Sequence, residues 1–173
     1  MAVFFNNPPD LYGFAFPGRY SGLFGHFFEL VAMAGGNLLD KNFKPAFVDK
    51  AGEWALGFLR KLYYEKKVVP SATPEWHYDE VTESFSSGHV AMTTDWPATF
   101  QNYREPSMSA VHDRFDVAIY PVGPTGKRYV YSGGFSYAIP TSCSDVDGAL
   151  SLMRFLLSEE AQYREARHGA IPV

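Results

Sequence analysis

Apolar side chains recur at helical spacing in the first part of the chain. Four of them follow the i, i+3, i+4, i+7 pattern of one helix face: Phe24, Phe27, Phe28 and Val31. Gly35-Gly36 come soon after and are typical of a helix end. The pattern therefore predicts a helix that carries aromatic residues on one face and ends before residue 35.

A second and clearer helix is predicted further along the chain. Its apolar residues alternate at intervals of three and one: Ala51, Trp54, Ala55, Phe58, Leu59 and Leu62. Basic residues gather at or beyond its end, where the helix dipole favours positive charge: Arg60, Lys61, Lys66 and Lys67. Because Trp54 lies on the apolar stripe, we interpret it as a core residue. A shorter helix is expected over residues 79–87, with Val81 and Phe85 inward and Gly88 just past its end.

Three segments have the composition of β-strands, namely residues 89–94, 115–120 and 129–139. A further short strand is expected near residues 12–16, and a short helix over residues 97–103. Since strands and helices are mixed along the chain, the pattern predicts an α/β fold.

The end of the chain predicts two more helices. Ser144-Asp145-Val146-Asp147 matches a capping box in which Asp takes the place usually held by Glu. A buried stripe is expected on the helix that follows: Ala149, Leu152, Met153 and Leu156. Glu159 and Glu160 open the last helix, which is expected to end at Gly169.

Composition narrows the classes of protein to consider. Hydrophobic residues make up 46% and charged residues 20% of 173 residues, which allows a sizeable core in one domain or one large lobe. The net charge of −4 and the lack of a basic stripe argue against nucleic-acid binding. No apolar run reaches the roughly 18 residues of a membrane span. Cys143 is the only cysteine, so no disulfide can form within the chain. The first residues lack the basic region and long apolar core of a signal peptide.

Catalytic and cofactor motifs are missing from the sequence. The five histidines do not fall at HExxH or CxxC-type metal spacings, and no GxSxG, GxGxxG or GxxxxGK[ST] occurs. We therefore expect no metal, no cofactor and no enzymatic activity.

Candidate ligand residues stand where strands end and where the first helix begins. Trp96 follows the strand at 89–94 and lies off any helical stripe, and Asp95 precedes it. Gly133 and Gly134 allow a close backbone approach, and Phe135 presents a ring beside them. Three more candidates stand at the front of the first helix, where backbone amides are free: Arg19, Tyr20 and Phe24. Aromatic faces beside backbone donors suit a sugar, whose C–H edges pack on rings while its hydroxyls need hydrogen bonds.

Five short motifs follow one another in the second half of the chain: Phe85-x-x-Gly88-x-x-Ala91-Met92, Asp95-Trp96-Pro97, Asp116-Val117-x-x-Tyr120-Pro121, Gly133-Gly134-Phe135-x-x-x-Ile139 and Ala149-x-x-x-x-x-Phe155-Leu156-x-Ser158-x-Glu160. This ordered series resembles the carboxy-terminal lobe of family 1 extracellular solute-binding proteins, the maltose-binding-protein-like, sugar-binding components of bacterial ABC importers. The resemblance spans about residues 8 to 173, and near the end residues 168–173 resemble the family's Gly-x-x-Pro segment.

The resemblance implies one lobe of a type II periplasmic-binding-protein fold, with a mixed sheet flanked by helices. Family members have two α/β lobes that close on a solute about a hinge. The closed form then docks on membrane permease subunits at the periplasmic or extracellular face of the membrane. On this basis Trp96, Gly134, Phe135 and Tyr20 are cleft residues, although many relatives carry Trp where Phe135 stands. We expect residues 1–173 to form a single carboxy-terminal lobe that lacks the amino-terminal lobe, the final helices and an export signal.

A single lobe offers only half of a two-sided site, so weak or no sugar binding is expected from the isolated chain. Its bared cleft aromatics would favour a dimer through that face. Three other functions stay open. The chain could bind a non-sugar solute such as glycerol phosphate, a polyamine or an iron complex. It could be a small carbohydrate-active hydrolase, which needs two carboxylates about 5–10 Å apart. It could also be an intracellular interaction domain.

Overall fold

The computed structural model describes residues 1–134 and 136–169. The chain folds as two compact units. Unit 1 consists of Met1–Asp95 and Asn102–Tyr131. Unit 2 consists of Trp96–Gln101 and Ser132–Val173. The backbone passes from unit 1 to unit 2 after Asp95 and again after Tyr131.

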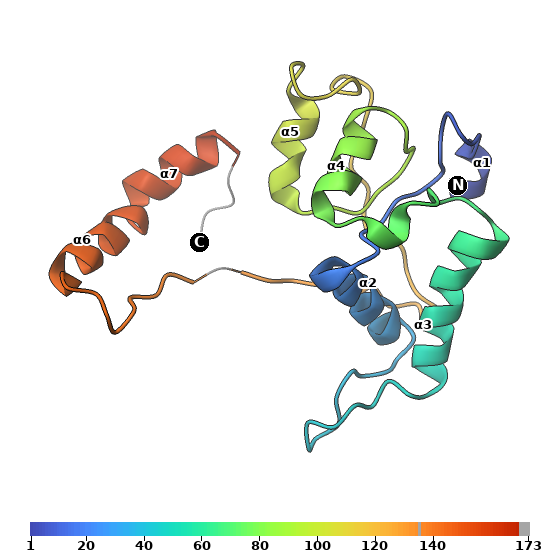
Figure 1. Cartoon of the computed structure of the whole chain (residues 1–173), viewed down its shortest axis with the longest axis horizontal. Coiled ribbons are helices and arrows are strands. Elements are labelled where there is room, and N and C mark those ends of the chain that lie inside the picture. The colour runs from blue at the N-terminus through green and yellow to red at the C-terminus, as the bar shows by residue number, and fades with distance from the viewer. Residues whose placement is uncertain (135, 170–173) are drawn as a thin grey trace. The chain divides into compact units, whose positions relative to one another are not determined.

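Helices make up most of the regular structure in the described residues (Figure 1). Those of unit 1 are α1 (Ala2–Phe5), α2 (Tyr20–Met33), α3 (Lys50–Arg60) with its π-helical extension η1 (Lys61–Glu65), the 3₁₀ turn η2 (Thr73–Glu75) and α4 (Tyr78–Ser86). Unit 2 contains the 3₁₀ turn η3 (Pro97–Thr99), α6 (Val146–Leu156) and α7 (Glu159–Arg167), while α5 (Phe100–Arg104) runs from one unit into the other. None of the described helices is both long and apolar enough to cross a membrane.

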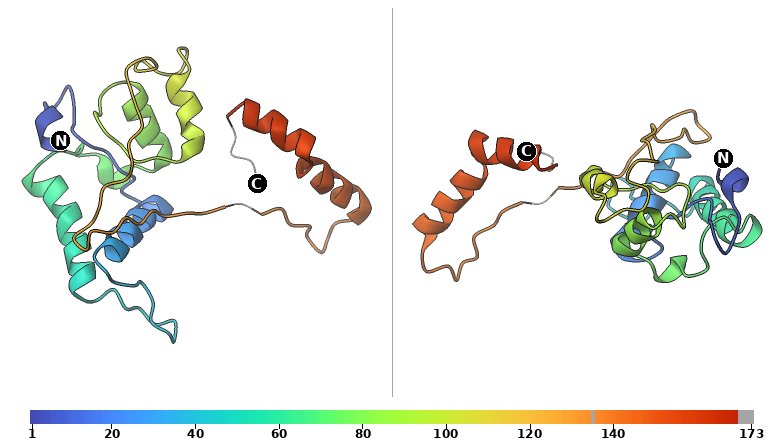
Figure 2. Two further views of the ribbon diagram at one scale, coloured as in Figure 1. Left: turned by 180° about the vertical axis from the view of Figure 1, so that it is seen from behind. Right: turned by 90° about the horizontal axis from the view of Figure 1, so that it is seen from above.

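Helices α2 and α3 pack side by side around the largest core of unit 1 (Figure 2). Its buried residues are Leu30, Val31, Met33, Ala51 and Ala55. Trp54 packs against this core, which confirms its interpretation as a core residue. The Asp49 carboxylate caps α3 by accepting hydrogen bonds from the amides of Ala51 and Gly52, both at 3.0 Å. Both predicted helices are thus confirmed, and Gly35 follows α2 with a φ of 87°.

The apolar face predicted for α2 is buried only in part, since Val31 is 1% exposed but its aromatic residues are not fully buried. Phe24 is 51% exposed, whereas Glu29 is only 7% exposed. Gly22, Gly25 and Leu30 are also buried. The buried side of α2 therefore carries two glycines and an acid. Pro17 and Tyr131 lie so close to Gly22 and Gly25 that no side chain would fit at these two positions.

The segments near residues 12–16 and 89–94 lie side by side in parallel, as two predicted strands should. Tyr12 pairs with Val90, and Ala15 pairs with Thr93, each as an isolated bridge. Ala15 and Val90 form a small core with Val81 of α4. This confirms the inward position predicted for Val81, and Gly88 ends the helix with a φ of 80°.

The other two predicted strands, residues 115–120 and 129–139, form no bridge within the described residues. A strand exists only where its amides and carbonyls meet those of a neighbour. In these segments, side chains bind two of the backbone groups that a neighbouring strand would otherwise bind. The amide of Tyr131 donates to the Glu29 carboxylate at 2.7 Å, and the carbonyl of Tyr120 accepts from the Arg128 guanidinium at 2.6 Å. The mixed sheet therefore stays a prediction.

Helices α6 and α7 were both predicted, but two details of α6 were wrong. Its cap is Asp145, not Ser144, since the Asp145 carboxylate accepts from the amide of Gly148 at 2.8 Å. Its apolar stripe is not buried: Leu152 is 58% exposed, and no residue of α6 is fully buried. The stripe instead lines an apolar hollow of about 240 Å³ together with residues 137–140 and Cys143.

Candidate functional site

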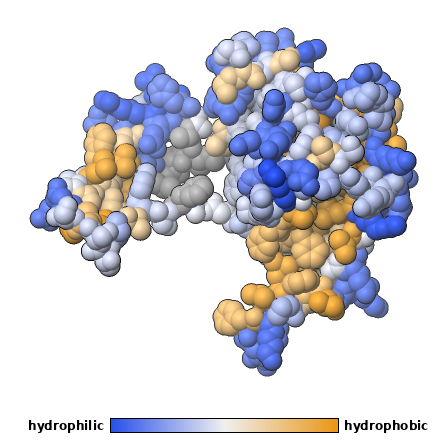
Figure 3. Space-filling view, viewed as in Figure 1, coloured by the Kyte–Doolittle hydropathy of each residue, from blue (hydrophilic) through white to orange (hydrophobic). Residues whose placement is uncertain are grey.

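Three aromatic residues follow one another along α2 at i, i+4 and i+8, so they lie on one side of the helix. Tyr20 is 74% exposed, Phe24 is 51% exposed and Phe28 is half-buried. The ring of Tyr131 packs edge-on against Phe24 and Phe28, with centroid distances of 6.0 and 6.2 Å. We call Tyr20, Phe24, Phe28 and Tyr131 the aromatic stripe. Figure 3 shows apolar side chains gathered over this part of unit 1.

Tyr20 has an unusual backbone conformation for a residue with a side chain. Its φ of 53° lies in the left-handed region, which non-glycine residues adopt at a cost and which clusters at ligand sites. Its ring meets the His77 ring edge-on at 5.9 Å, and His77 Nε2 lies 3.2 Å from Ser21 Oγ. Tyr20 is thus both strained and exposed, and its role as a ligand residue stays a prediction.

Arg19 is engaged with carboxylates of its own unit. Its guanidinium lies 3.5 Å from Glu80 and 4.0 Å from Glu75, and also over the ring of Tyr20 at 5.0 Å. The pKa of Glu80 is lowered, first by the hydrogen bond from the His77 amide, then by the hydrogen bond from its own amide, and less strongly by the charge of Arg19. Two of its guanidinium nitrogens therefore face carboxylates, whereas its buried Nε has no hydrogen-bond partner within the described residues. Its role as a ligand residue stays a prediction.

Asp95 also has partners within unit 1. Its carboxylate accepts a hydrogen bond from Thr82 Oγ1 at 2.9 Å and a short one from the Tyr103 hydroxyl. Tyr103 is buried. The structure therefore places Asp95 as a link between α4 and α5, immediately before Trp96.

In unit 2, Trp96 is partly exposed and caps η3, where its carbonyl accepts from Thr99 Oγ1 at 2.6 Å. Gly133 and Gly134 are exposed. A Cβ placed on Gly134 would meet no heavy atom within 4 Å, so packing within the described residues does not demand a glycine there. Phe135 lies outside the described residues.

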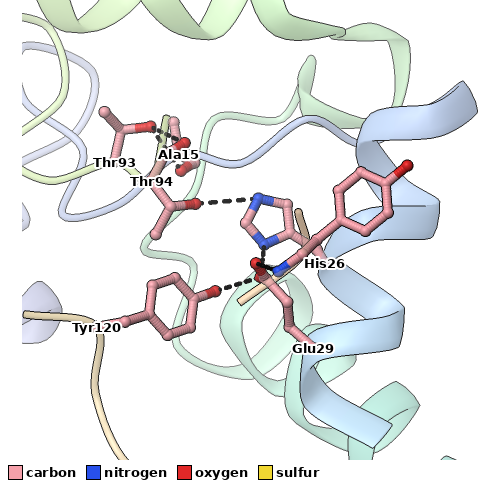
Figure 4. Close-up of polar contacts among 7 residues, drawn as sticks. Ala15, His26, Glu29, Thr93, Thr94 and Tyr120 are labelled. Carbon is pink, nitrogen blue, oxygen red and sulfur yellow. Dashed lines mark hydrogen bonds and ion pairs between the residues drawn. The ribbon is translucent and has the colours of Figure 1, made fainter. Parts of the chain in front are cut away.

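Sequence reasoning missed a buried polar cluster centred on Glu29 (Figure 4). The Glu29 carboxylate accepts from the Tyr120 hydroxyl at 2.6 Å and the Tyr131 amide at 2.7 Å, and it lies 3.3 Å from His26 Nδ1. His26 Nε2 is in turn 3.0 Å from Thr94 Oγ1. One signal could have revealed the cluster, because Glu29 is the single charge within the apolar run of residues 27–33.

The cluster shifts the pKa values of two of its members. Burial is the largest influence on Glu29 and raises its pKa, but the hydrogen bonds from His26, Tyr120 and the Tyr131 amide together outweigh it and lower the pKa below 4.5. For Tyr120, burial first and the hydrogen bond to Glu29 second raise the pKa far above its ordinary value. At neutral pH Glu29 is therefore an anion and Tyr120 a neutral donor.

A separate hollow of about 300 Å³ lies in unit 1 at the end of α2. It is lined by Phe28, the backbone of Gly35-Gly36, Thr125 and Lys127, among others. No predicted ligand residue lines it. Within the described residues, no group of three or more His, Cys, Asp or Glu side chains could hold a metal ion.

Comparison with known proteins decides the family. The chain matches the family of bacterial extracellular solute-binding proteins over residues 5–163. The chain belongs to this family. It is 25% identical over 160 residues to a probable ABC transporter-binding protein of Deinococcus radiodurans. This match covers 91% of this chain but 37% of that protein. It is also 27% identical over 139 residues to a probable amino-acid ABC transporter periplasmic-binding protein of Sinorhizobium fredii, covering 80% of this chain and 30% of that one.

Solved structures show the same fold. Maltose-bound MalE3 of T. maritima is 28% identical and superposes with a TM-score of 0.86, covering 94% of this chain and 42% of that one. A Thermotoga lettingae ABC transporter solute-binding protein bound with alpha-D-tagatose is 23% identical and superposes with a TM-score of 0.87. The match covers 99% of this chain and 44% of that one. The chain thus has the fold of the periplasmic-binding proteins, and its family and neighbours are transport-binding proteins rather than enzymes. It spans less than half the length of these relatives.

Proposed function

We propose that this chain is part of the substrate-binding component of a bacterial ABC importer and that the whole protein binds a sugar or polyol. The observation that carries the proposal is the likeness to maltose-bound MalE3, which combines 28% identity with a TM-score of 0.86 over 94% of the chain. The whole protein then delivers its solute to membrane permease subunits from the periplasmic or extracellular side.

The proposed ligand residues are aromatic or glycine positions. In unit 1, Tyr20 and Phe24 of the aromatic stripe offer exposed rings on which the apolar face of a sugar packs. In unit 2, Trp96 offers an indole ring, while Gly133 and Gly134 offer exposed backbone groups for hydroxyls, with Phe135 beside them. Arg19, which lies over the Tyr20 ring, and Asp95, which precedes Trp96, complete the proposed set, and both also contact protein groups.

The chain corresponds to the carboxy-terminal lobe of a two-lobed protein in this proposal. A ligand held from one side loses as much translational and rotational freedom as one held from both, but makes fewer contacts. The isolated chain should therefore bind sugar weakly or not at all. Dimerisation of the isolated chain through its exposed aromatic residues is the associated prediction, and sedimentation measures it directly.

A thermal-shift screen of the full-length protein tests the proposed function. The solutes are mono- and oligosaccharides, polyols, polyamines, glycerol phosphate, iron complexes and amino acids. A solute at 100 times its Kd stabilises the folded protein by about 2.7 kcal/mol, so a true ligand raises Tm clearly. We expect a sugar or polyol to do so, and Trp96→Ala to weaken its binding at least about tenfold. A shift with an amino acid alone would instead favour the solute class named for the Sinorhizobium fredii relative.

Gly134→Ala separates ligand contact from folding. The new methyl group meets no protein atom within 4 Å, so the variant should be as stable as the wild type. If a sugar approaches the backbone there, the methyl group should weaken binding about tenfold. Titration calorimetry and thermal unfolding measure the two effects.

Gly57→Ala is the matched control, because a Cβ at this exposed position of α3 also meets nothing within 4 Å. It should leave the affinity unchanged. Wild-type affinity in Gly134→Ala would remove Gly134 from the proposed site.

A further inference from the structure

We propose that the His26–Glu29 pair is a shared anchor that positions the two segments carrying the proposed ligand residues, so that Glu29 is a positioning residue for solute binding. This inference rests on the proposed function. It adds a residue that lies on the buried side of α2 and lines none of the exposed surface.

Each member of the pair holds the base of one segment. His26 Nε2 lies 3.0 Å from Thr94 Oγ1, two residues before Trp96. Glu29 Oε1 accepts from the amide of Tyr131 at 2.7 Å, two residues before Gly133. Because His26 and Glu29 are one helical turn apart with their side chains 3.3 Å from each other, both segments start from one polar contact in unit 1.

The anchor also reaches the aromatic stripe. Glu29 binds the amide of Tyr131, and the ring of the same Tyr131 packs on Phe24 and Phe28. Its ring also lies directly against Gly25 on the same helix, where an added Cβ would stand 2.9 Å from the ring. A shift of the Tyr131 backbone would therefore move a neighbour of the exposed Phe24 ring.

Additional contacts make the anchor rigid. The second oxygen of Glu29 is occupied by the Tyr120 hydroxyl at 2.6 Å and by His26, so both oxygens have partners and the carboxylate cannot rotate freely (Figure 4). On the far side, Thr93 Oγ1 donates to the carbonyl of Ala15 at 3.2 Å, and Thr93 pairs with Ala15 as a parallel bridge. The segment before Trp96 is thus held from two directions.

A buried acid is an unusual choice for filling space. Taking a carboxylate out of water is unfavourable, and an apolar side chain at position 29 would continue the run of apolar residues around it. Unlike an apolar residue, a carboxylate fixes the direction of each donor that it binds. The arrangement therefore favours a role in geometry over a role in filling space.

The test compares Glu29→Gln with Val31→Ala in the full-length protein. Glu29→Gln keeps the side-chain size but loses the charge and one acceptor oxygen. Val31→Ala creates a cavity on the same helix at a residue that is 1% exposed, and its apolar side chain takes no part in the anchor's hydrogen bonds. Both variants should have a lower Tm, because each removes buried contacts, so all measurements are made well below both melting temperatures.

Two readouts distinguish positioning from stability. Hydrogen exchange should become at least about tenfold faster in peptides covering residues 94–96 and residues 131–134 of Glu29→Gln, and in neither for Val31→Ala. Affinity for the solute found in the thermal screen should fall about tenfold in Glu29→Gln alone.

The inference is overturned if Glu29→Gln behaves like Val31→Ala in both readouts, or if only one of the two segments exchanges faster. If the wild-type protein binds none of the solutes, the proposed function fails. In that case hydrogen exchange alone still decides whether Glu29 anchors both segments.

Discussion

Gly52→Ala should lower the free energy of unfolding by about 3 kcal/mol, at the upper end of what overpacking costs. Gly52 lies in the first turn of α3, where an added Cβ would stand 1.8 Å from the carbonyl oxygen of Phe47 and 2.9 Å from its carbon. Both are backbone atoms, so no change of rotamer can relieve the overlap. Either the turn before α3 or the helix itself must move, which would disturb the core around Ala51 and Ala55.

The matched variant in the same helix is Gly57→Ala. Gly57 is exposed and its Cβ would meet nothing within 4 Å, so the better helix propensity of alanine should stabilise the chain by about 0.5–1 kcal/mol. Helix propensity alone predicts stabilisation at both positions, whereas the structure predicts opposite signs. Urea unfolding of the two variants measures the difference, and equal stabilisation would refute the close contact at Gly52.

Glu29→Ala should destabilise the protein by about 3 kcal/mol at neutral pH, as expected when one partner of a buried charged cluster is removed. The variant leaves the Tyr120 hydroxyl, the Tyr131 amide and His26 without the carboxylate that they contact in the wild type. Buried donors without an acceptor carry their full cost of desolvation.

The destabilisation caused by Glu29→Ala should depend on pH, and the direction of the shift in the pKa of Glu29 decides whether it grows or shrinks on acidification. The pKa of Glu29 is lower in the folded protein than its ordinary value of 4.5, so the folded state favours the ionised form. Stability gained in this way is complete above pH 4.5 and is lost as the pH falls through the lowered pKa. The difference in unfolding free energy between the wild type and Glu29→Ala should therefore narrow on acidification below about pH 4.5.

Glu83→Ala provides the comparison for this profile, because Glu83 is an exposed acid on α4. Its removal should change the stability by less than about 0.5 kcal/mol at any pH. A Glu29→Ala difference that stays constant from neutral to acidic pH would contradict the pKa direction assigned to Glu29.

Local sequence was sufficient to find the longer helices, although it missed the short α1. The spacing of apolar residues located α2, α3 and α4, and glycines beyond their ends marked where two of them stop. These signals act within a few residues, through helix periodicity and capping, so no distant partner is needed to recognise them. The same locality explains the one-residue error at the start of α6, where Ser144 and Asp145 are both good caps and only the structure shows which one binds the amide of Gly148.

The family, too, was recognisable from the sequence, because an ordered series of short motifs is specific even where each motif is weak. Residue type and position suggested the proposed ligand residues, the resemblance placed four of them in the cleft, and the structure describes the surroundings of each except Phe135. It shows Tyr20 strained and exposed, and it shows Arg19 and Asp95 bound to groups of their own unit.

What the sequence by itself determined is therefore the longer helices and the family. Tertiary structure alone decided which face of α2 is buried, which carbonyls and amides of residues 115–131 find partners, and what holds the segments before Trp96 and Gly133. The reason is physical. A charged residue such as Glu29 is unfavourable in a core until donors from distant parts of the chain surround it, and those donors, at Tyr120 and Tyr131, are brought to it only by folding.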